Sequence, residues 1–459
     1  MLTKQFFKNK RVTVFGLGLN GGGVGTVKFL AKCGAKQIIV TDIKKRSELT
    51  SSLEALKGLK NVTYVLGQHR PEDFTRTDMV VINPGIAWTN EYVKLALKHK
   101  VPVEMDASLF FQLCERPIIG ITGTKGKTTT ASLIAHILEA AGHHVVRVGI
   151  SQVPVLGILD DIKSRSIVVF ELSSWRLSSL GRTHQSPHIA VFTNFFPDHL
   201  NYYKTLDDYA RDKSYIFSSQ TSNDWLVYNE ANDRVCSMVE DAVSRKMAFS
   251  SEFTLQGDGV FFRDEMVVVR LGENEEEIVS FSQLGLRGEH QRSNVLGAIG
   301  ASVAYGVKGE VIRKALKSFS GVPHRLEYIR EKQGVKYYND SAATVPEAAI
   351  FAIRSFQEPI VLIAGGNNKG LEFSAFGEAI AENVKKVIFF AGEATEKLIK
   401  IVRKHLPEER KDEELVIVNS MDEAVKQASL VAEVGDVVLL SPGATSFGLF
   451  QNEFDRGEQ

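Results

Sequence analysis

One short stretch of the chain combines the residue types that a phosphate site needs, namely Gly123 to Thr129 (GTKGKTT). Glycines allow main-chain amides to face phosphate oxygens, a lysine can reach the β and γ phosphates, and a threonine hydroxyl can hold Mg²⁺. Lys127 and Thr128 stand where this chemistry requires them, although the strict phosphate-loop pattern would have glycine in place of Ile121. Because an apolar run precedes the stretch and an amphipathic one follows it, we predict a nucleotide site at a strand-to-helix turn.

Three polar residues further along the chain could complete such a site. Glu171 ends an apolar run, where a carboxylate beside a phosphate loop is useful as a metal ligand. His199 follows a second apolar run, and its neutral imidazole could bind a metal or orient a substrate. Lys213 lies four residues after Tyr209, on the same face of an expected helix. Taken singly, each has a simpler interpretation: a helix-end acid, an ordinary histidine and a solvated lysine.

A second glycine turn lies near the N-terminus. Gly16, Gly18 and Gly21 form a G-x-G-x-x-G pattern after an apolar run, which is typical of dinucleotide-binding turns. Asp42 ends the next apolar run, where such proteins carry an acid for the ribose. The amides at a helix N-terminus accept any phosphate, so the turn alone does not distinguish a dinucleotide from another phosphate ligand.

Composition narrows the class of protein. The chain has 459 residues, of which 44% are hydrophobic, and its 55 basic residues balance 55 acidic ones. A net charge of zero predicts no nucleic-acid partner. The three cysteines are widely spaced, which indicates neither a disulfide framework nor a zinc site. With no signal peptide and no apolar run of about 18 residues, we expect a soluble, cytoplasmic protein without membrane insertion.

The elements that position these residues alternate between strand and helix patterns. Short β-branched runs predict strands at 12–15, 37–41, 62–66, 79–82, 101–105, 166–171, 188–194, 359–366, 386–392, 415–419 and 436–443. Helical patterns lie between them. We predict an α/β protein of three domains: a Rossmann-like domain over 1–108, a central phosphate-loop domain with a mostly parallel sheet over 109–321, and a second Rossmann-like domain over 322–459.

Read in order, the motifs of this chain resemble those of the Mur ligase family. The order is the glycine loop, then ELSSW at 171–175, NFFPDH at 194–199 and the Tyr209–Lys213 pair. Further matches are GEHQRSN at 288–294, PHRLE at 323–327, NDSAAT at 339–344, GGNNKG at 365–370 and SPGATSF at 441–447. The resemblance covers essentially the whole chain. ELSS followed by an aromatic residue, together with the tail motif, is similar to the D-glutamate-adding branch.

This resemblance implies an ATP-dependent, amide-forming ligase of cytoplasmic peptidoglycan precursor synthesis. ATP would phosphorylate the alanine carboxylate of UDP-N-acetylmuramoyl-L-alanine, and the amine of D-glutamate would then displace phosphate. The N-terminal turn would hold the UDP-sugar and not a dinucleotide. The resemblance also implies two Mg²⁺ sites, a carbamate formed on Lys213 by CO₂, and a monomer whose partners are the small molecules UDP-N-acetylmuramoyl-L-alanine, ATP and glutamate.

The resemblance assigns individual residues to these roles. The catalytic residues are Lys127, Glu171, His199 and Lys213, and the metal ligands are Thr128, Glu171, His199 and the carbamate of Lys213. The ATP contacts are Gly123, Thr124, Lys125, Gly126, Lys127, Thr128, Thr129, Asn294, His324, Arg325 and Asp340. The UDP-substrate contacts are Gly18, Leu19, Asn20, Asp42, Ile43, Asn83, Gly85 and Ser151. The glutamate contacts are Thr344, Lys369, Ser446 and Phe447.

Departures from the family pattern leave alternatives open. Ala342 replaces a lysine, Gly448 and Glu453 replace an acid and an apolar residue, and Ser151 replaces an asparagine. The alternative acceptor is therefore L-glutamate. Other interpretations are a folylpolyglutamate synthase-like ligase, an NAD-dependent dehydrogenase and a non-catalytic nucleotide-binding protein. The first lacks an N-terminal domain of this kind, the second leaves the phosphate loop unused, and the third gives the catalytic set no role.

Overall fold

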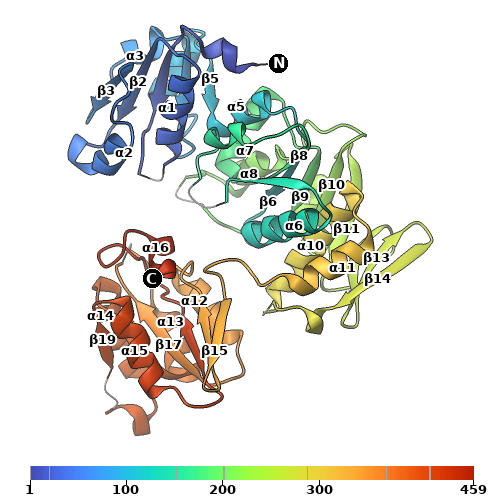
Figure 1. Cartoon of the computed structure of the whole chain (residues 1–459), viewed down its shortest axis with the longest axis vertical. Helices are drawn as coiled ribbons and strands as arrows, with labels where there is room; N and C mark the ends of the chain where they lie inside the picture. Colours follow the sequence, from blue (N-terminus) through green and yellow to red (C-terminus); the bar gives the residue numbers. More distant parts are fainter. Residues whose placement is uncertain are drawn as a thin grey trace. The chain divides into compact units, whose positions relative to one another are not determined.

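Three α/β domains with largely parallel sheets follow one another in the computed structural model (Figure 1), which confirms the predicted fold class. The structure describes residues 2–19, 21–150, 153–199, 202–286, 288–368, 370–412 and 415–459, without the side chain of His290. The chain forms two compact units, Met1–Gln283 with Arg292–Ser318 and Leu284–Gln291 with Phe319–Gln459. Among the described residues, no helix is long and apolar enough to cross a membrane.

The first domain is built on a parallel sheet in the order β3-β2-β1-β4-β5. Its strands are β1 (Arg11–Phe15), β2 (Gln37–Asp42), β3 (Val62–Leu66), β4 (Met79–Ile82) and β5 (Val103–Met105). Its helices are α1 (Gly22–Lys32), α2 (Thr50–Glu54), α3 (Glu72–Thr75), α4 (Glu91–Lys98) and α5 (Asp106–Leu113). The apolar runs become strands because both faces of this sheet are covered. Helix α5 spans residue 108, so the expected domain boundary lies inside a helix.

The central domain has a nine-stranded sheet in the order β14-β13-β12-β11-β10-β9-β6-β8-β7. Its strands are β6 (Ile118–Thr122), β7 (His144–Val148), β8 (Ser166–Glu171), β9 (Ile189–Phe192), β10 (Trp225–Asn229), β11 (Arg245–Ser250), β12 (Gly259–Arg263), β13 (Met266–Leu271) and β14 (Asn274–Ser280). Its helices are α6 (Lys127–Ala140), α7 (Ser174–Thr183), α8 (Leu206–Ser214), α9 (Asp233–Val239), α10 (His290–Tyr305) and α11 (Gly309–Ser318). Among the described strands of this sheet, only the β12–β13 and β13–β14 pairs are antiparallel.

The last domain has a six-stranded sheet in the order β15-β16-β20-β17-β18-β19. Its strands are β15 (Glu327–Lys332), β16 (Val335–Asn339), β17 (Ile360–Gly365), β18 (Val384–Phe390), β19 (Val416–Val418) and β20 (Val437–Leu440). Its helices are α12 (Pro346–Arg354), α13 (Ser374–Asn383), α14 (Glu393–His405), α15 (Met421–Val431) and α16 (Glu453–Glu458). Because β16, β20 and β17 are parallel neighbours, the loops that follow them meet at one edge of the sheet.

Candidate active site

The glycine loop at 123–126 joins β6 to α6, as its sequence predicted. Gly123 has a backbone φ of 153° and Gly126 has one of 81°. Residues other than glycine rarely adopt these angles. A Cβ atom at Gly123 would lie 1.9 Å from Thr193 Oγ1, and one at Gly126 would lie 2.1 Å from Asn294 Oδ1. The two glycines are therefore required both by the backbone conformation and by close neighbours, one of which is the predicted ATP contact Asn294.

Asn194 holds this loop from the neighbouring strand, and its role was not predicted. It follows β9, and its Oδ1 accepts hydrogen bonds from the main-chain amides of Thr124 (3.1 Å) and Lys125 (2.9 Å). Its Nδ2 donates to the Lys125 carbonyl at 3.1 Å. A polar amide directly after a buried strand was the available sequence signal. Asn194 thus fixes the main chain of the loop.

The start of α6 and the end of β8, which carry predicted catalytic residues, meet beside this loop. The Thr128 hydroxyl donates to Glu171 Oε2 at 2.8 Å, which joins the start of α6 to the end of β8. Lys127 Nζ lies 3.0 Å from the carbonyl oxygens of both Gly123 and Thr124. Because β6 and β8 are parallel neighbours, their carboxyl ends bring an ammonium, a hydroxyl and a carboxylate to one edge of the sheet.

Lys213 is buried in the same place rather than solvated on the surface of α8. Its side chain is 1% exposed, and its Nζ donates to the Gly123 carbonyl at 2.7 Å. It also lies 4.8 Å from the centre of the Tyr209 ring. Burial, and secondly the charge of Lys127, hold the pKa of Lys213 well below its usual range. The simpler interpretation of Lys213 as a solvated surface lysine is wrong.

His199 lies beside an aromatic group at the same sheet edge. Its ring is 5.1 Å from that of Trp175 and 5.8 Å from that of Tyr209, measured between ring centres. Burial lowers the pKa of His199, and the nearby lysines lower it further, against the opposing effect of Asp198. A neutral imidazole is the form that can bind a metal. No group of three or more His, Cys, Asp or Glu side chains that could hold a metal occurs in the part of the chain that the structure describes.

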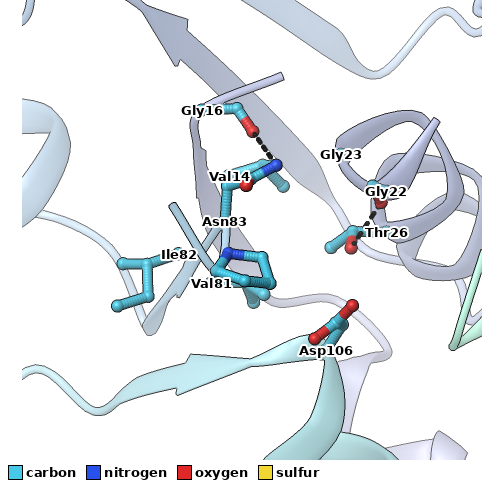
Figure 2. Close-up of a pocket in the computed structure, with 10 residues that line it drawn as sticks. Val14, Gly16, Gly22, Gly23, Thr26, Val81, Ile82, Asn83 and Asp106 are labelled. Carbon is cyan, nitrogen blue, oxygen red and sulfur yellow. Dashed lines mark hydrogen bonds between the residues drawn. The ribbon is translucent and has the colours of Figure 1, made fainter. Parts of the chain in front are cut away.

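The N-terminal glycine turn surrounds a small pocket at the edge of the first sheet (Figure 2). The pocket is lined by Val14, Gly16, Gly22, Gly23, Thr26, Val81, Ile82, Asn83, Pro84 and Asp106. Asn83 lies at the end of β4, and its Nδ2 is 3.4 Å from the Gly16 carbonyl. Asp106, from the start of α5, faces the pocket in Figure 2, and it pairs with Arg176 of α7 at 3.0 Å. This pair of a buried aspartate and a half-buried arginine, which was not predicted, links the first domain to the central one.

Asp42 shapes the same turn. Its carboxylate is buried, and its oxygens accept hydrogen bonds from the main-chain amides of Gly18 (3.0 Å) and Lys44 (2.9 Å). Both hydrogen bonds fix the main chain of the turn, and a contact of Asp42 with a ligand stays a prediction. Of the other predicted UDP-substrate contacts, Leu19 and Ile43 are exposed apolar side chains, and the Gly85 amide donates to Asn83 Oδ1 at 3.2 Å. Asn20 and Ser151 lie outside the described residues.

The predicted acceptor residues Thr344, Ser446 and Phe447 lie on the loops that follow β16 and β20. The loop after β20 is bonded to the loop after β17 by two main-chain hydrogen bonds of 3.1 Å between Asn367 and Thr445. The buried hydroxyl of Ser446 has no hydrogen-bond partner among the described residues, so it can serve a ligand. Thr344 is half-buried and Phe447 is exposed. Lys369 lies outside the described residues.

The predicted third-domain ATP contacts lie near these loops. Asp340 directly follows β16 and is buried, with Oδ2 accepting from the Ser441 hydroxyl (2.7 Å) and Oδ1 from the Leu326 amide (3.1 Å). Burial raises the pKa of Asp340 to about 7. His324 is buried with Nδ1 3.0 Å from Asn339 Nδ2, whereas Arg325 is exposed. Asp340 and His324 are thus fixed by the protein itself, and their contact with ATP stays a prediction.

Three protein families match successive parts of the chain. Residues 10–104 match the Mur ligase MurD-like N-terminal domain, residues 121–302 the Mur ligase middle domain, and residues 324–443 the Mur ligase glutamate ligase domain. A solved structure of UDP-N-acetylmuramate-alanine ligase MurC from Thermotoga maritima has a TM-score of 0.58 at 18% identity, covering 95% of this chain and 96% of that one. The MurF ligase of the same organism has a TM-score of 0.55 at 18% identity, covering 100% and 95%. These two structures share the fold.

Curated relatives match over nearly the full length. The "UDP-N-acetylmuramoylalanine--D-glutamate ligase" of Roseiflexus sp. (strain RS-1) is 39% identical over 98% of this chain and 97% of its own. Proteins of the same name from Acetivibrio thermocellus and Borreliella burgdorferi (strain ATCC 35210) are 36% and 37% identical, covering 99% and 98% of this chain and 96% and 97% of their own. With all three domains matched in order, this chain belongs to the Mur ligase family.

Proposed function

We propose that this chain is an ATP-dependent ligase that joins D-glutamate to UDP-N-acetylmuramoyl-L-alanine during peptidoglycan precursor synthesis. The observation that carries the ATP chemistry is the 2.8 Å bond between Thr128 and Glu171 beside Lys127 of the glycine loop. The choice of substrates rests on the name shared by the full-length relatives. An oxygen of the alanine carboxylate attacks the γ-phosphorus of ATP and displaces ADP, which gives an acyl phosphate. The glutamate amine then attacks the acyl carbon, phosphate leaves, and the amine nitrogen loses a proton as the amide forms.

The chain's own residues account for the electrostatics of the first step. Lys127 neutralises charge on the transferred phosphoryl group, and the loop amides that Asn194 does not occupy face the phosphates. Mg²⁺, when bound, would offset further phosphate charge. It is commonly held by one or two carboxylates together with phosphate oxygens and water, and the adjoining Thr128 and Glu171 oxygens fit that donor set. His199 would contribute to a second ion.

Lys213 fits this site only if its charge changes. As an ammonium it would lie close to Lys127 and to bound metal, and both contacts would be repulsive. Burial favours its neutral amine, which is the form that adds CO₂ to give an anionic carbamate. We therefore propose that Lys213 is carbamylated, so that oxygen atoms replace the ammonium beside the phosphate loop.

Glutamate is assigned to the last domain through the free hydroxyl of Ser446, with Thr344, Phe447 and Lys369 completing the contacts. Lys369→Ala should raise the KM for glutamate, because a desolvated carboxylate then loses its cation, at a cost of roughly 2–5 kcal/mol. The KM for ATP should change little. Phosphate release measured at several glutamate concentrations checks this contact.

The function itself is tested by phosphate release from ATP in the presence of UDP-N-acetylmuramoyl-L-alanine. Release should require that substrate and D-glutamate together, with L-glutamate supporting much less. If L-glutamate supports turnover and D-glutamate does not, the acceptor assignment changes to L-glutamate, and the assignment as a ligase stays. Turnover with aspartate, lysine or glycine but with neither glutamate enantiomer would contradict the acceptor assignment.

A further inference from the structure

Arg456 of the C-terminal helix α16 is among the largest fully buried side chains of the described residues, with 1% of its surface exposed. Its guanidinium donates from Nε to Ser341 Oγ (3.0 Å), from Nη2 to the Ser341 carbonyl (2.8 Å) and from Nη1 to the Ala444 carbonyl (3.2 Å). Burying a charge is costly unless it is hydrogen-bonded, and here three protein oxygens accept hydrogen bonds from the guanidinium. Burying this guanidinium costs a large desolvation penalty, which points to a structural or functional role among the residues that it contacts.

The two loops that Arg456 joins are the ones that carry candidate glutamate contacts. Ser341 belongs to the loop after β16, which leads to Thr344, and Ala444 belongs to the loop after β20, which leads to Ser446. Neither residues 340–344 nor residues 441–450 contain a lysine or arginine of their own. Arg456 therefore brings a positive charge to two loops that would otherwise have none.

Helix α16 is seated closely on this region by further contacts. The Ser341 hydroxyl donates to the Glu453 carbonyl at 2.7 Å, and Asn339 Nδ2 donates to the Gly457 carbonyl at 3.0 Å. A Cβ atom at Gly457 would lie 2.3 Å from the His324 ring, so only glycine allows this approach. The helix that carries Arg456 is thus held at both of its ends. Its Glu453 end contacts Ser341 in the loop after β16, and its Gly457 end contacts Asn339, the last residue of β16.

We propose that Arg456 is a positioning residue of the acceptor site, holding the loops of Thr344 and Ser446 at a fixed separation and supplying positive charge for a dicarboxylate amino acid. This role rests on the proposed ligase function. Among the described residues no carboxylate pairs with Arg456 at ion-pair distance, although the charges of Glu453 and Asp340 act on it. Its hydrogen bonds go to the two loops, through the carbonyls of Ser341 and Ala444. Although burial lowers its pKa to about 10, the guanidinium stays protonated at neutral pH.

The test compares four full-length variants by glutamate-dependent phosphate release with saturating ATP and UDP-N-acetylmuramoyl-L-alanine. Arg456→Met removes the charge. Arg456→Lys keeps the charge but loses the planar guanidinium that donates to both loops. Ser341→Ala removes the hydroxyl that accepts from Nε. Gln459→Ala, at an exposed position on the same segment, is the control. Residues that orient metal ligands typically contribute about 10- to 100-fold, and we expect a similar range for a residue that orients a binding loop. We expect Arg456→Met to raise the KM for glutamate by about tenfold or more, Arg456→Lys and Ser341→Ala to raise it less, and the KM for ATP to stay within about twofold in all variants.

A purely structural role would lower the yield of active enzyme, seen as a reduced kcat, without a selective change in the KM for glutamate. If Arg456→Met does not fold, as judged by near-ultraviolet circular dichroism, the KM values for glutamate of Arg456→Lys and Ser341→Ala test the proposal. Wild-type KM values for glutamate in both would overturn the proposal while leaving the ligase function intact. A wild-type enzyme without glutamate-dependent phosphate release would overturn the ligase function and this inference with it.

Discussion

The two glycine turns of the first unit begin alike and differ in the charges around them. In each, a parallel strand leads through a left-handed glycine, Gly21 (φ 79°) or Gly126 (φ 81°), into a helix. The N-terminal turn has no lysine or arginine between residues 16 and 27, and an acid clamps it. The central loop has two lysines of its own and a buried third beside it.

The difference in nearby lysines distinguishes a turn that can only bind phosphate from a loop that can also transfer a phosphoryl group. Helix N-terminal amides are enough to hold a phosphate that does not react, as a UDP-sugar diphosphate would be. Transferring a phosphoryl group also needs cations and metal-binding oxygens that act on developing charge. Only the central loop has them, in Lys127 and the Thr128–Glu171 pair. A shared backbone pattern therefore does not indicate a shared role, and changes at the two turns should have separable effects.

The largest separable effect is expected at Lys127. Lys127→Ala should reduce ligation by about 10²–10³-fold, because a donor to the transferred phosphoryl group is lost. Binding of UDP-N-acetylmuramoyl-L-alanine should stay nearly unchanged when it is measured by calorimetry. Lys28→Ala, at an exposed lysine of α1, is the matched control for the other turn and should behave as wild type. Loss of UDP-sugar affinity in Lys127→Ala would show that the two turns are not separate sites.

A second effect concerns the charge of Lys213. Lys213→Ala should lower activity by about 10²-fold, as displaced reacting groups commonly do. Short carboxylic acids should partly restore it by standing in for the carbamate, whereas Lys213→Arg, which keeps a cation, should not be restored. Lys204→Ala, at an exposed lysine, should leave activity unchanged. Full activity of an enzyme whose Lys213 is shown by mass spectrometry and crystallography to be a free amine would refute the carbamate.

A smaller effect is expected at the clamp of the N-terminal turn. Asp42→Ala leaves the Gly18 and Lys44 amides without their acceptor, and hydrogen bonds to a charged group contribute roughly 1.5–3 kcal/mol. We expect the Kd for UDP-N-acetylmuramoyl-L-alanine to rise about tenfold or more, with ATP affinity unchanged. Asp78→Ala removes an acid that accepts from the Arg11 amide at the other end of β1, and it should leave both affinities intact. Equal effects of the two substitutions on UDP-sugar binding would remove the special role of Asp42.

The last effect concerns the stability of the last domain, which should depend on pH, and not binding or turnover. Burial raises the pKa of Asp340 to about 7, whereas an exposed aspartate has a pKa of about 3.9. Between these values the folded chain holds a proton that the unfolded chain has lost, so this group's contribution to stability falls as pH rises from about 4 to about 7. Asp340→Asn should lose that dependence. Hydrogen exchange of the β16 and β20 amides measures it, and identical pH profiles for wild type and variant would contradict the raised pKa.

Local sequence patterns predicted most strands and helices but few of the contacts that residues make between elements. Apolar β-branched runs bounded by turn residues indicated β1, β6 and β8 correctly, because such runs suit strands buried on both faces. No pattern of that kind occurs in β15, a polar edge strand held by its antiparallel partner β16. The burial of Lys213 and of Arg456 likewise depends on partners far apart in sequence, so each reads as an ordinary surface cation in isolation.

The central claim, that the alanine carboxylate is activated as an acyl phosphate, has one direct test. UDP-N-acetylmuramoyl-L-alanine labelled with ¹⁸O in its alanine carboxylate is turned over with ATP and D-glutamate, and the inorganic phosphate is examined by mass spectrometry. Attack of a carboxylate oxygen on the γ-phosphorus, followed by cleavage of the acyl carbon–oxygen bond, predicts that one ¹⁸O atom is transferred to each phosphate released from fully labelled substrate. Phosphate without ¹⁸O, formed together with the ligated product, would contradict the account.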